Sequence, residues 1–343
     1  MQKKIIILCT VILIVVMEAL FALIGALMPG PFTGTVTDAE TNEPIANVSV
    51  SDGRNVVKTD ENGAYTLPGY SKSRFVTVTT PAGYWTENYY IPVTKDRETY
   101  DFRLDKSEKT AQADHSFLQI SDSEIGAKGV GAWIEHVRDT VKETDPAFLI
   151  HTGDICYEDG LKQHIKDMNT ENMGVPVRYV IGNHDYVAGK YGEALFESIY
   201  GPVWYSFDVG NVHYVVTPFQ TGADYASGYN KNDRWKWLEN DLANVEPGMK
   251  VVMFNHTKAP SDDYVLSYGL KKLDLKEHDL IAWVYGHYHY NYITETDGVL
   301  NISTGRPDCG GIDSSASGSR LISITANGQV STQMYYYDFE QPQ

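Results

Sequence analysis

Short runs of alternating hydrophobic and polar residues fill the part of the chain that follows residue 31. They lie at residues 34–37, 47–51, 55–59, 64–67, 75–79 and 100–104. Turn-forming pairs such as Asp52-Gly53 and Asn62-Gly63 separate them. A period of two residues is typical of strands with one buried face. The pattern therefore predicts a small all-β, antiparallel sandwich over residues 30–105.

From residue 115 onward, apolar runs of strand length alternate with helical patterns. Strands are expected at residues 117–120, 147–151, 177–181, 204–208, 212–216, 251–254, 281–285, 299–303 and 321–325. Helices are expected near residues 130–141, 161–168, 193–200 and 233–245. This alternation predicts an α/β domain over residues 115–343. The polar, aperiodic segment 106–114 is predicted to be a linker.

An apolar run at residues 5–28 follows Lys3 and Lys4, and Glu18 is its only charge. The run is long enough to span a bilayer. Glu18 costs about 2.5–3.5 kcal/mol on insertion scales, but each Leu, Ile, Val or Phe returns roughly 0.3–0.6 kcal/mol, so insertion stays favourable. We expect residues 1–29 to be a membrane anchor, with the rest of the chain extracytoplasmic. A cleaved signal peptide, which would make the protein secreted, remains the alternative, although no small-x-small cleavage site follows Glu18.

The composition of the 343-residue chain excludes some classes of partner and of metal site. Its net charge of −17 argues against nucleic acid, because phosphate backbones need basic patches. The only cysteines are Cys9, Cys156 and Cys309, too few for a disulfide scaffold or a thiolate zinc site. Cys156 and Cys309 lie on loops after predicted strands and either pair in an oxidising compartment or stay free thiols.

Polar clusters follow five of the predicted strands. They are Ser121-Asp122-Ser123-Glu124, Gly153-Asp154, Gly182-Asn183-His184-Asp185, Asn255-His256 and Gly286-His287-Tyr288-His289. The carboxyl ends of strands in α/β sheets converge on one crevice, so these clusters can meet. Oxygen and imidazole ligands suit Mn, Fe, Zn or Co. The candidates are too many for one ion and suit two ions about 3.5–4 Å apart that share a carboxylate and a water.

With these blocks in order, residues 115–330 resemble a calcineurin-like metallophosphoesterase. The family pattern is Asp-x-His, Gly-Asp-x-x, Gly-Asn-His-Asp/Glu, His and Gly-His-x-His, and four of the five blocks match. The resemblance implies two central mixed sheets flanked by helices. It implies metal ligation by Asp154 as the bridge, Asp122 and His289 at the first metal, and Asn183, His256 and His287 at the second. It also implies that His184 donates a proton to the leaving group and that Asp185 orients it.

Glu124 departs from the family pattern, because it stands where the family usually has His. Glu124 is our preferred fourth ligand of the first metal. Tyr157 is the alternative, since purple acid phosphatases also lack that His and use the Tyr of Gly-Asp-x-x-Tyr. Arg306 follows the strand after Gly-His-x-His. Its guanidinium either donates bidentate hydrogen bonds to a phosphate or is solvated.

The text "GTVTDAETNEPIANVSVSDGRNVVKTDENGAYTLPGY" at residues 34–70 resembles the carboxypeptidase-regulatory-like (transthyretin-like) sandwich domain. Such domains carry no catalysis. The resemblance implies a spacer that holds the second domain off the membrane, with contact to glycan or protein of the cell envelope as the alternative.

These observations predict an extracytoplasmic hydrolase with two divalent metals. It would cleave phosphomonoesters or phosphodiesters by attack of hydroxide generated at the metals. Two other classes of function stay open. One is a binding protein that kept the fold and lost turnover, which the departure at Glu124 favours. The other is an adhesion protein whose main function lies in the sandwich domain.

Overall fold

The computed structural model describes residues 30–124, 130–187, 192–218, 231–307 and 316–337. The apolar run at residues 5–28, Cys9 and Cys309 lie outside these ranges. Within the ranges, no helix is long and apolar enough to cross a membrane.

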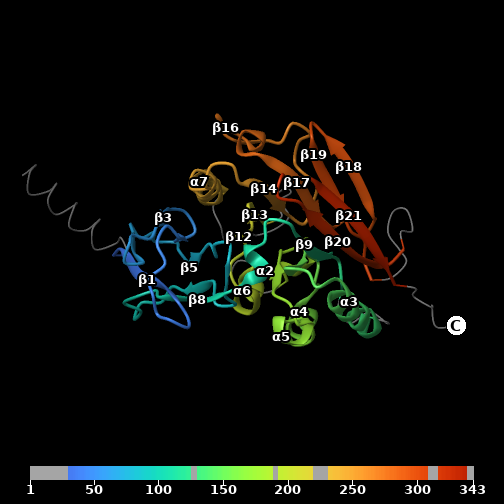
Figure 1. The fold of residues 1–343 in the computed structure, drawn as a ribbon, viewed down its shortest axis with the longest axis horizontal. Coiled ribbons are helices and arrows are strands. Elements are labelled where there is room, and N and C mark those ends of the chain that lie inside the picture. Colours follow the sequence, from blue (N-terminus) through green and yellow to red (C-terminus); the bar gives the residue numbers. More distant parts are fainter. Residues whose placement is uncertain (1–29, 125–129, 188–191, 219–230, 308–315, 338–343) are drawn as a thin grey trace, which may run out of the picture.

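The N-terminal domain consists of two four-stranded sheets, at the blue end of the chain in Figure 1. One has the order β4 (Ala64–Leu67), β1 (Phe32–Asp38), β8 (Phe102–Lys106), β6 (Tyr84–Trp85). The other has the order β3 (Val56–Lys58), β2 (Ser49–Ser51), β5 (Phe75–Val78), β7 (Tyr90–Pro92). The predicted all-β character of this domain is confirmed.

Two details of the N-terminal domain differ from the sequence-based expectation. β1 pairs with β8 in parallel, so the sandwich is mixed and not purely antiparallel. These are the first and last strands of the domain, and no hairpin turn joins them, so either direction is open to them. The additional strands β6 and β7 are only two and three residues long, too short to show an alternating pattern.

The segment predicted as a linker contains ordered structure. β8 runs to Lys106, and helix α2 (Glu108–Ala111) follows directly. Ser107 caps this helix, because its side chain accepts a hydrogen bond from the amide of Thr110. The Thr110 hydroxyl donates to the carbonyl of Tyr84 at 3.1 Å, and the Thr110 carbonyl accepts from the amide of Gly210 at 2.8 Å. The segment is therefore fixed to both domains.

The C-terminal domain contains two mixed sheets, as expected from the family resemblance. The first has the order β11 (Val177–Tyr179), β10 (Phe148–His151), β9 (His115–Ile120), β20 (Gly318–Ile324), β21 (Val330–Tyr336). The second has the order β12 (Tyr205–Val209), β13 (Val212–Val216), β14 (Lys250–Phe254), β17 (Leu280–Tyr285), β19 (Val299–Ser303), β18 (Tyr292–Thr296). β9, β10 and β11 are parallel, as are β13, β14, β17 and β19. A separate hairpin joins β15 (Val265–Tyr268) to β16 (Lys271–Asp274).

Helices flank these sheets (Figure 1). They are α3 (Val130–Thr144), α4 (Glu158–Asp167), α5 (Thr170–Met173), α6 (Ala194–Tyr200) and α7 (Lys231–Leu242), with 3₁₀ turns η1 (Asn183–Asp185) and η2 (Leu275–His278). α3 buries Trp133, Ile134 and Val137 on the face that packs against the core, at the helical spacing expected of an amphipathic helix. Between the two sheets, aromatic rings pack closely: the Phe117 ring centroid lies 4.9 Å from that of Phe148 and 5.4 Å from that of Phe254.

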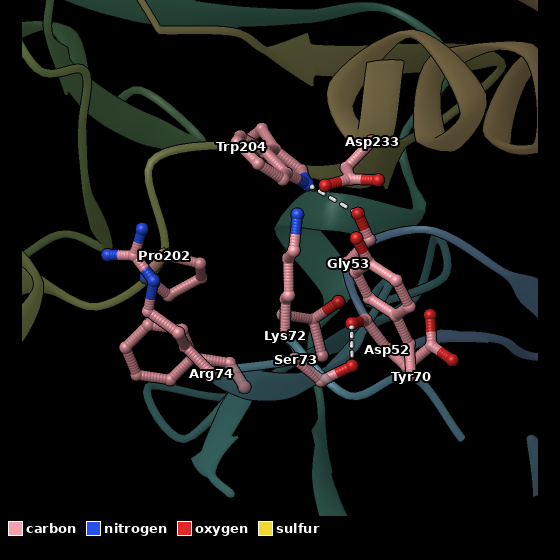
Figure 2. A pocket seen from close by; sticks show the side chains of 11 residues that line it. Asp52, Gly53, Tyr70, Lys72, Ser73, Arg74, Pro202, Trp204 and Asp233 are labelled. Carbon is pink, nitrogen blue, oxygen red and sulfur yellow. Dashed lines mark hydrogen bonds between the residues drawn. The ribbon is translucent and has the colours of Figure 1, made fainter. Parts of the chain in front are cut away.

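The two domains share a hydrophobic core, which joins buried residues of the N-terminal strands to β9, β10, β12 and β13. Figure 2 shows part of this boundary, where the indole N–H of Trp204 donates to the carbonyl of Gly53 at 3.2 Å. Nearby, Arg74 forms ion pairs with Glu193 and Glu197 at the start of α6. The N-terminal domain thus packs directly against the C-terminal domain over a buried surface, beyond what a simple spacer requires.

Candidate metal centre

The polar clusters converge at the carboxyl ends of five strands. Asp122 follows β9, Asp154 follows β10, and Asn183 opens η1 after β11. His256 follows β14, and His287 and His289 follow β17 in the second sheet. Because the two sheets face each other, ligands from both meet in one crevice.

Five of the predicted residues form two groups around two neighbouring positions. One ligand atom from each of Asp154, His256 and His287 lies within 4.8 Å of the other two, and the same holds for Asp122, Asp154 and His289. Asp154 belongs to both groups. Its Oδ2 lies 3.1 Å from Nε2 of His256. A carboxylate shared by two such groups is the arrangement that two metal ions with a bridging ligand require.

His256 is oriented for ligation by its second ring nitrogen. Nδ1 lies 2.7 Å from the carbonyl of Thr152, so it carries the proton and donates it. Nε2 faces Oδ2 of Asp154 at 3.1 Å and the amide oxygen of Asn183 at 3.2 Å, on the side where a metal ion would be ligated. A backbone carbonyl that fixes the tautomer of an imidazole is a common support of metal-binding histidines. The donor set and its orientation therefore fit a pair of divalent ions.

Charge at this centre follows from burial and from close oppositely charged neighbours. Burial lowers the pKa of His256, but Asp154 outweighs it and raises that pKa to about 9. Burial raises the pKa of Asp154, but His256 brings the net pKa below its ordinary value. Burial and the neighbouring His256 lower the pKa of His287, which favours the neutral, ligating imidazole. The hydrogen bond to Asp122 raises the pKa of His289.

Backbone strain is concentrated around the centre. Of the thirteen described non-glycine residues with positive φ, seven belong to these loops: Asp122, Glu124, Asp154, Cys156, Tyr157, His287 and His289. Such conformations cost about 1–3 kcal/mol each and persist where the surroundings enforce them. Gly153 permits a close approach of two site loops, because it has a φ of +101° and an added Cβ would lie 2.5 Å from Nδ1 of His256.

Comparison with known proteins agrees with this geometry. The family model described as "Calcineurin-like phosphoesterase" matches residues 115–291, just over half of the chain. The chain belongs to the calcineurin-like phosphoesterase family. The model described as "N terminal of Calcineurin-like phosphoesterase" matches residues 30–107. The protein is thus a metal-dependent phosphoric ester hydrolase of a dimetal family, and the recognition and fold predicted from sequence are confirmed.

Solved structures resemble this phosphoesterase at low identity. A dimetal phosphatase from Danio rerio is 12% identical with a TM-score of 0.45, covering 65% of this chain and 99% of that one. GAP50, the anchor in the inner membrane complex of Plasmodium, is 14% identical with a TM-score of 0.47, covering 65% of this chain and 84% of that one. A novel archaeal phosphodiesterase is 15% identical with a TM-score of 0.34, covering 64% of this chain and 99% of that one. No curated protein matches the chain.

His184 lies at the edge of the phosphoesterase site. Its side chain is 41% exposed, and Nε2 is 3.9 Å from Oδ2 of Asp154. The His184 amide donates to Oδ1 of Asp154 at 2.8 Å, which ties the loop to the shared carboxylate. An accessible imidazole beside the metal positions can reach a departing oxygen, so its place is compatible with the predicted proton transfer.

Asp185 occupies a different position from the one expected. Its carboxylate is buried and accepts hydrogen bonds from the amides of Gly182 at 2.8 Å, Cys156 at 2.8 Å and Asp154 at 3.1 Å. Burial and the charge of Asp154 raise its pKa, while the amides of Cys156 and Gly182 lower it. The residue therefore clamps two site loops together through their backbone. The expectation that it contacts the His184 ring has no support in these hydrogen bonds.

Glu124 and Arg306 form an ion pair beside the first metal position. Oε2 of Glu124 lies 2.8 Å from Nη2 of Arg306, and Oε1 lies 4.0 Å from Nε2 of His289. Glu124 is not part of the compact groups described above, so its ligation stays a prediction. Arg306 is not simply solvated, because it also contacts Nδ1 of His289 at 3.3 Å.

Tyr157 and Cys156 complete the predicted set. Tyr157 is 60% exposed at the start of α4, and its ring centroid lies 5.6 Å from that of His184. Cys156 is buried, and its pairing with Cys309 stays open because Cys309 lies outside the described residues.

Sequence reasoning missed His151, the last residue of β10. Its Nδ1 accepts from the amide of Gly153 at 3.2 Å, and its Nε2 lies 2.8 Å from the Ser123 hydroxyl. His151 therefore links the loops that carry Asp122 and Asp154. A histidine that ends an apolar run directly before Thr-Gly-Asp was the available signal, but one buried His is usually part of a core.

Proposed function

We propose that the protein hydrolyses phosphomonoesters or phosphodiesters on the extracytoplasmic side of a membrane, using hydroxide generated at two metal ions. The observation that carries the reaction is the position of Asp154 in both ligand groups. Two divalent ions bound there would supply Lewis acidity and a nucleophile near neutral pH.

The residues of the chain divide the remaining work. Asp122 and His289 would hold one ion, Asn183, His256 and His287 would hold the other, and Asp154 would be shared by both. His184 gives a proton to the departing alkoxide, which it can reach because its ring is partly exposed at the edge of the centre. Arg306 is placed by Glu124 to donate to phosphoryl oxygens.

Turnover of p-nitrophenyl phosphate and bis-p-nitrophenyl phosphate by the purified full-length protein tests the reaction. Activity is expected after addition of Mn²⁺, Fe²⁺, Zn²⁺ or Co²⁺ and is expected to disappear after exhaustive chelation. The ratio of the two rates separates a monoesterase from a diesterase. Full turnover after chelation would overturn the proposal, and stoichiometric metal binding without any turnover would identify a binding protein instead.

The extracytoplasmic location is supported by the apolar run at residues 5–28 behind Lys3 and Lys4. Protease applied to intact cells is expected to cleave the protein, and the membrane fraction is expected to retain it with its N-terminus uncleaved. A soluble protein whose mature N-terminus lies between residues 19 and 35 would contradict the anchor. Contact of the N-terminal domain with the cell envelope is part of the same proposal.

A further inference from the structure

A pocket of about 650 Å³ opens beside the metal centre. We call it the Trp283 pocket, and its main lining residues are Arg234, Leu238, Met253, Leu266, Trp283 and Tyr288. Its volume falls in the range of about 300–1,000 Å³ that small-molecule sites occupy.

The pocket adjoins the metal centre, because residues next to the candidate metal ligands in the sequence also line the pocket. Asn255 and Thr257, which flank His256, line it, and so does Tyr288, which stands between His287 and His289. The Tyr288 ring contacts the His287 ring with centroids 4.8 Å apart and planes at 77°. A group bound in the pocket therefore lies next to the second metal position, where a substituent of the phosphoryl group would extend.

More than half of the residues that line the pocket are apolar or aromatic. Among them, Met253 and Trp283 are buried, and Leu266 of β15 is half-buried. The Trp283 indole N–H donates to the carbonyl of Thr257 at 2.8 Å, so its polar atom is already satisfied. The apolar part of the lining offers hydrocarbon and ring faces, which favour an aromatic or extended apolar group, and Lys258 is among the polar lining residues.

Arg234 adds a positive charge to this apolar pocket. It lies on α7, is half-buried, and donates to the carbonyl of Pro218 at 3.4 Å. Among the described residues it forms no ion pair with a carboxylate, unlike Lys236 two residues further along α7, which pairs with Glu239 at 3.0 Å. Burial lowers the pKa of Arg234 to about 10, which leaves it charged at neutral pH. A partly desolvated cation with no acidic partner in the described part of the chain favours an anionic group on the ligand.

We propose that the Trp283 pocket binds the leaving group of the substrate and that this group is aromatic or extended and apolar, with a second anionic group placed at Arg234. The inference rests on the proposed phosphoesterase function. Hydrolysis breaks the bond between phosphorus and the ester oxygen, water supplies the new oxygen on phosphorus, and the alcohol takes up the proton. The pocket contributes by holding that alcohol in line with the metals.

Three phosphomonoesters test the pocket: glycerol phosphate, 2-naphthyl phosphate and 6-carboxy-2-naphthyl phosphate. The Michaelis constant should fall in that order for the metal-loaded full-length protein. Arg234→Ala should raise it about tenfold for the carboxylated ester, because one charge-assisted contact is lost, and should leave the plain naphthyl ester almost unchanged. Arg234→Lys should recover part of the loss, and Lys236→Ala on the same helix is the matched control.

A second variant fills the pocket without removing charge. Leu266→Trp should raise the Michaelis constant for both naphthyl esters and leave glycerol phosphate unaffected, because only the larger groups need the space. Equal changes for all three esters would overturn the pocket as a leaving-group site.

Binding of 6-hydroxy-2-naphthoate, the expected product, gives a readout that needs no turnover. Calorimetry with the metal-free protein should show saturable binding that weakens about tenfold in Arg234→Ala. Hydrolysis without such binding, and with unaltered Michaelis constants, would overturn the inference and leave the phosphoesterase function standing. Binding without hydrolysis of any ester would support the pocket and overturn the proposed function.

Discussion

The guanidinium of Arg178 lies 3.7 Å from the centroid of the Trp85 ring. It is also 4.1 Å from the centroid of Tyr89, and its Nη2 donates to the carbonyl of Thr86 at 3.1 Å. Arg178 belongs to β11, a few residues before the loop that carries Asn183, whereas its three partners belong to the N-terminal domain. The N-terminal domain thus supports the strand that places a metal ligand.

Replacement of Arg178 should weaken both domains together. Arg178→Ala is expected to lower the free energy of unfolding by about 2 kcal/mol or more, because a desolvated cation–π contact of that strength is lost. Urea unfolding followed by tryptophan fluorescence measures the change. Arg97→Ala is the matched control, since Arg97 is exposed and lies 5.8 Å from the Tyr100 centroid. It should change stability by less than about 0.5 kcal/mol, and equal effects of the two variants would contradict the buried clamp.

The two ligand groups should lose metal separately. His287→Ala should remove one metal equivalent and His289→Ala the other, because each residue belongs to a single group. Asp154→Asn should remove both ions and all activity, since it is shared. Elemental analysis of the purified variants gives the stoichiometry. His278→Ala, on η2, serves as the control and should keep both metals; an Asp154→Asn variant with two tightly bound ions would refute the shared carboxylate.

His184→Ala should lose rate while keeping both metals. A positioned acid contributes roughly 10²–10⁴-fold, and the loss should be largest for alkyl phosphates, whose leaving groups need protonation. Good leaving groups such as p-nitrophenol need little help, so the defect should shrink with p-nitrophenyl phosphate. Steady-state rates on both ester types test this, and equal losses on the two would argue against proton donation.

Glu124 should ligate the first metal through Oε1, with Arg306 holding Oε2. A carboxylate favours hard divalent ions such as Mn²⁺ or Fe²⁺, and affinity should fall as pH falls and the carboxylates protonate. Glu124→Ala should lose one metal equivalent, while Glu158→Ala, which only breaks a surface pair with Lys162, should lose none.

Tyr157 is the alternative to Glu124 as a ligand of the first metal, and the two assignments predict different spectra. If Tyr157 were the ligand, iron-loaded protein would show a visible tyrosinate charge-transfer band that Tyr157→Phe removes. We expect colourless protein, because the Tyr157 side chain is largely exposed. A coloured protein that keeps both metals after Glu124→Ala would reverse the assignment.

His213 should make stability depend on pH. Its Nδ1 lies 2.6 Å from Asp208 and its Nε2 lies 3.0 Å from Asp241. Burial alone lowers the pKa of His213, but Asp241 and Asp208 raise it to about 10. The folded pKa exceeds the unfolded value of about 6.5, so the stabilisation is complete below the unfolded pKa and is lost as pH rises through the folded one.

His213→Gln should therefore destabilise the protein by about 3 kcal/mol near neutral pH, because two buried carboxylates lose their cation. The difference from the native protein should narrow as pH rises toward 10. Urea unfolding at pH 6, 8 and 10 measures it, with His136→Gln as control. A difference that grows with pH would contradict a protonated His213.

The candidate metal ligands and the positions of most strands along the chain were predictable from the sequence because both are local signals. Each polar cluster follows an apolar run directly, and parallel strands bring their carboxyl ends together, so Asp122, Asp154 and His287 could be placed at one crevice without coordinates. The helix and strand patterns depended on periodicity in the same way. The short strands β6 and β7 carried too few residues to produce one.

Only the tertiary structure decided contacts between segments that are distant in the chain. The direction of β8 along β1, the turn of Asp185 onto backbone amides and the burial of Arg178 against Trp85 depend on how loops and domains pack, which no local pattern encodes. The Trp283 pocket forms where α7, β15 and two site loops meet. The sequence by itself determined the chemistry of the ligands, whereas packing determined their orientation and the space beside them, because orientation depends on neighbours that the chain brings together only when it folds.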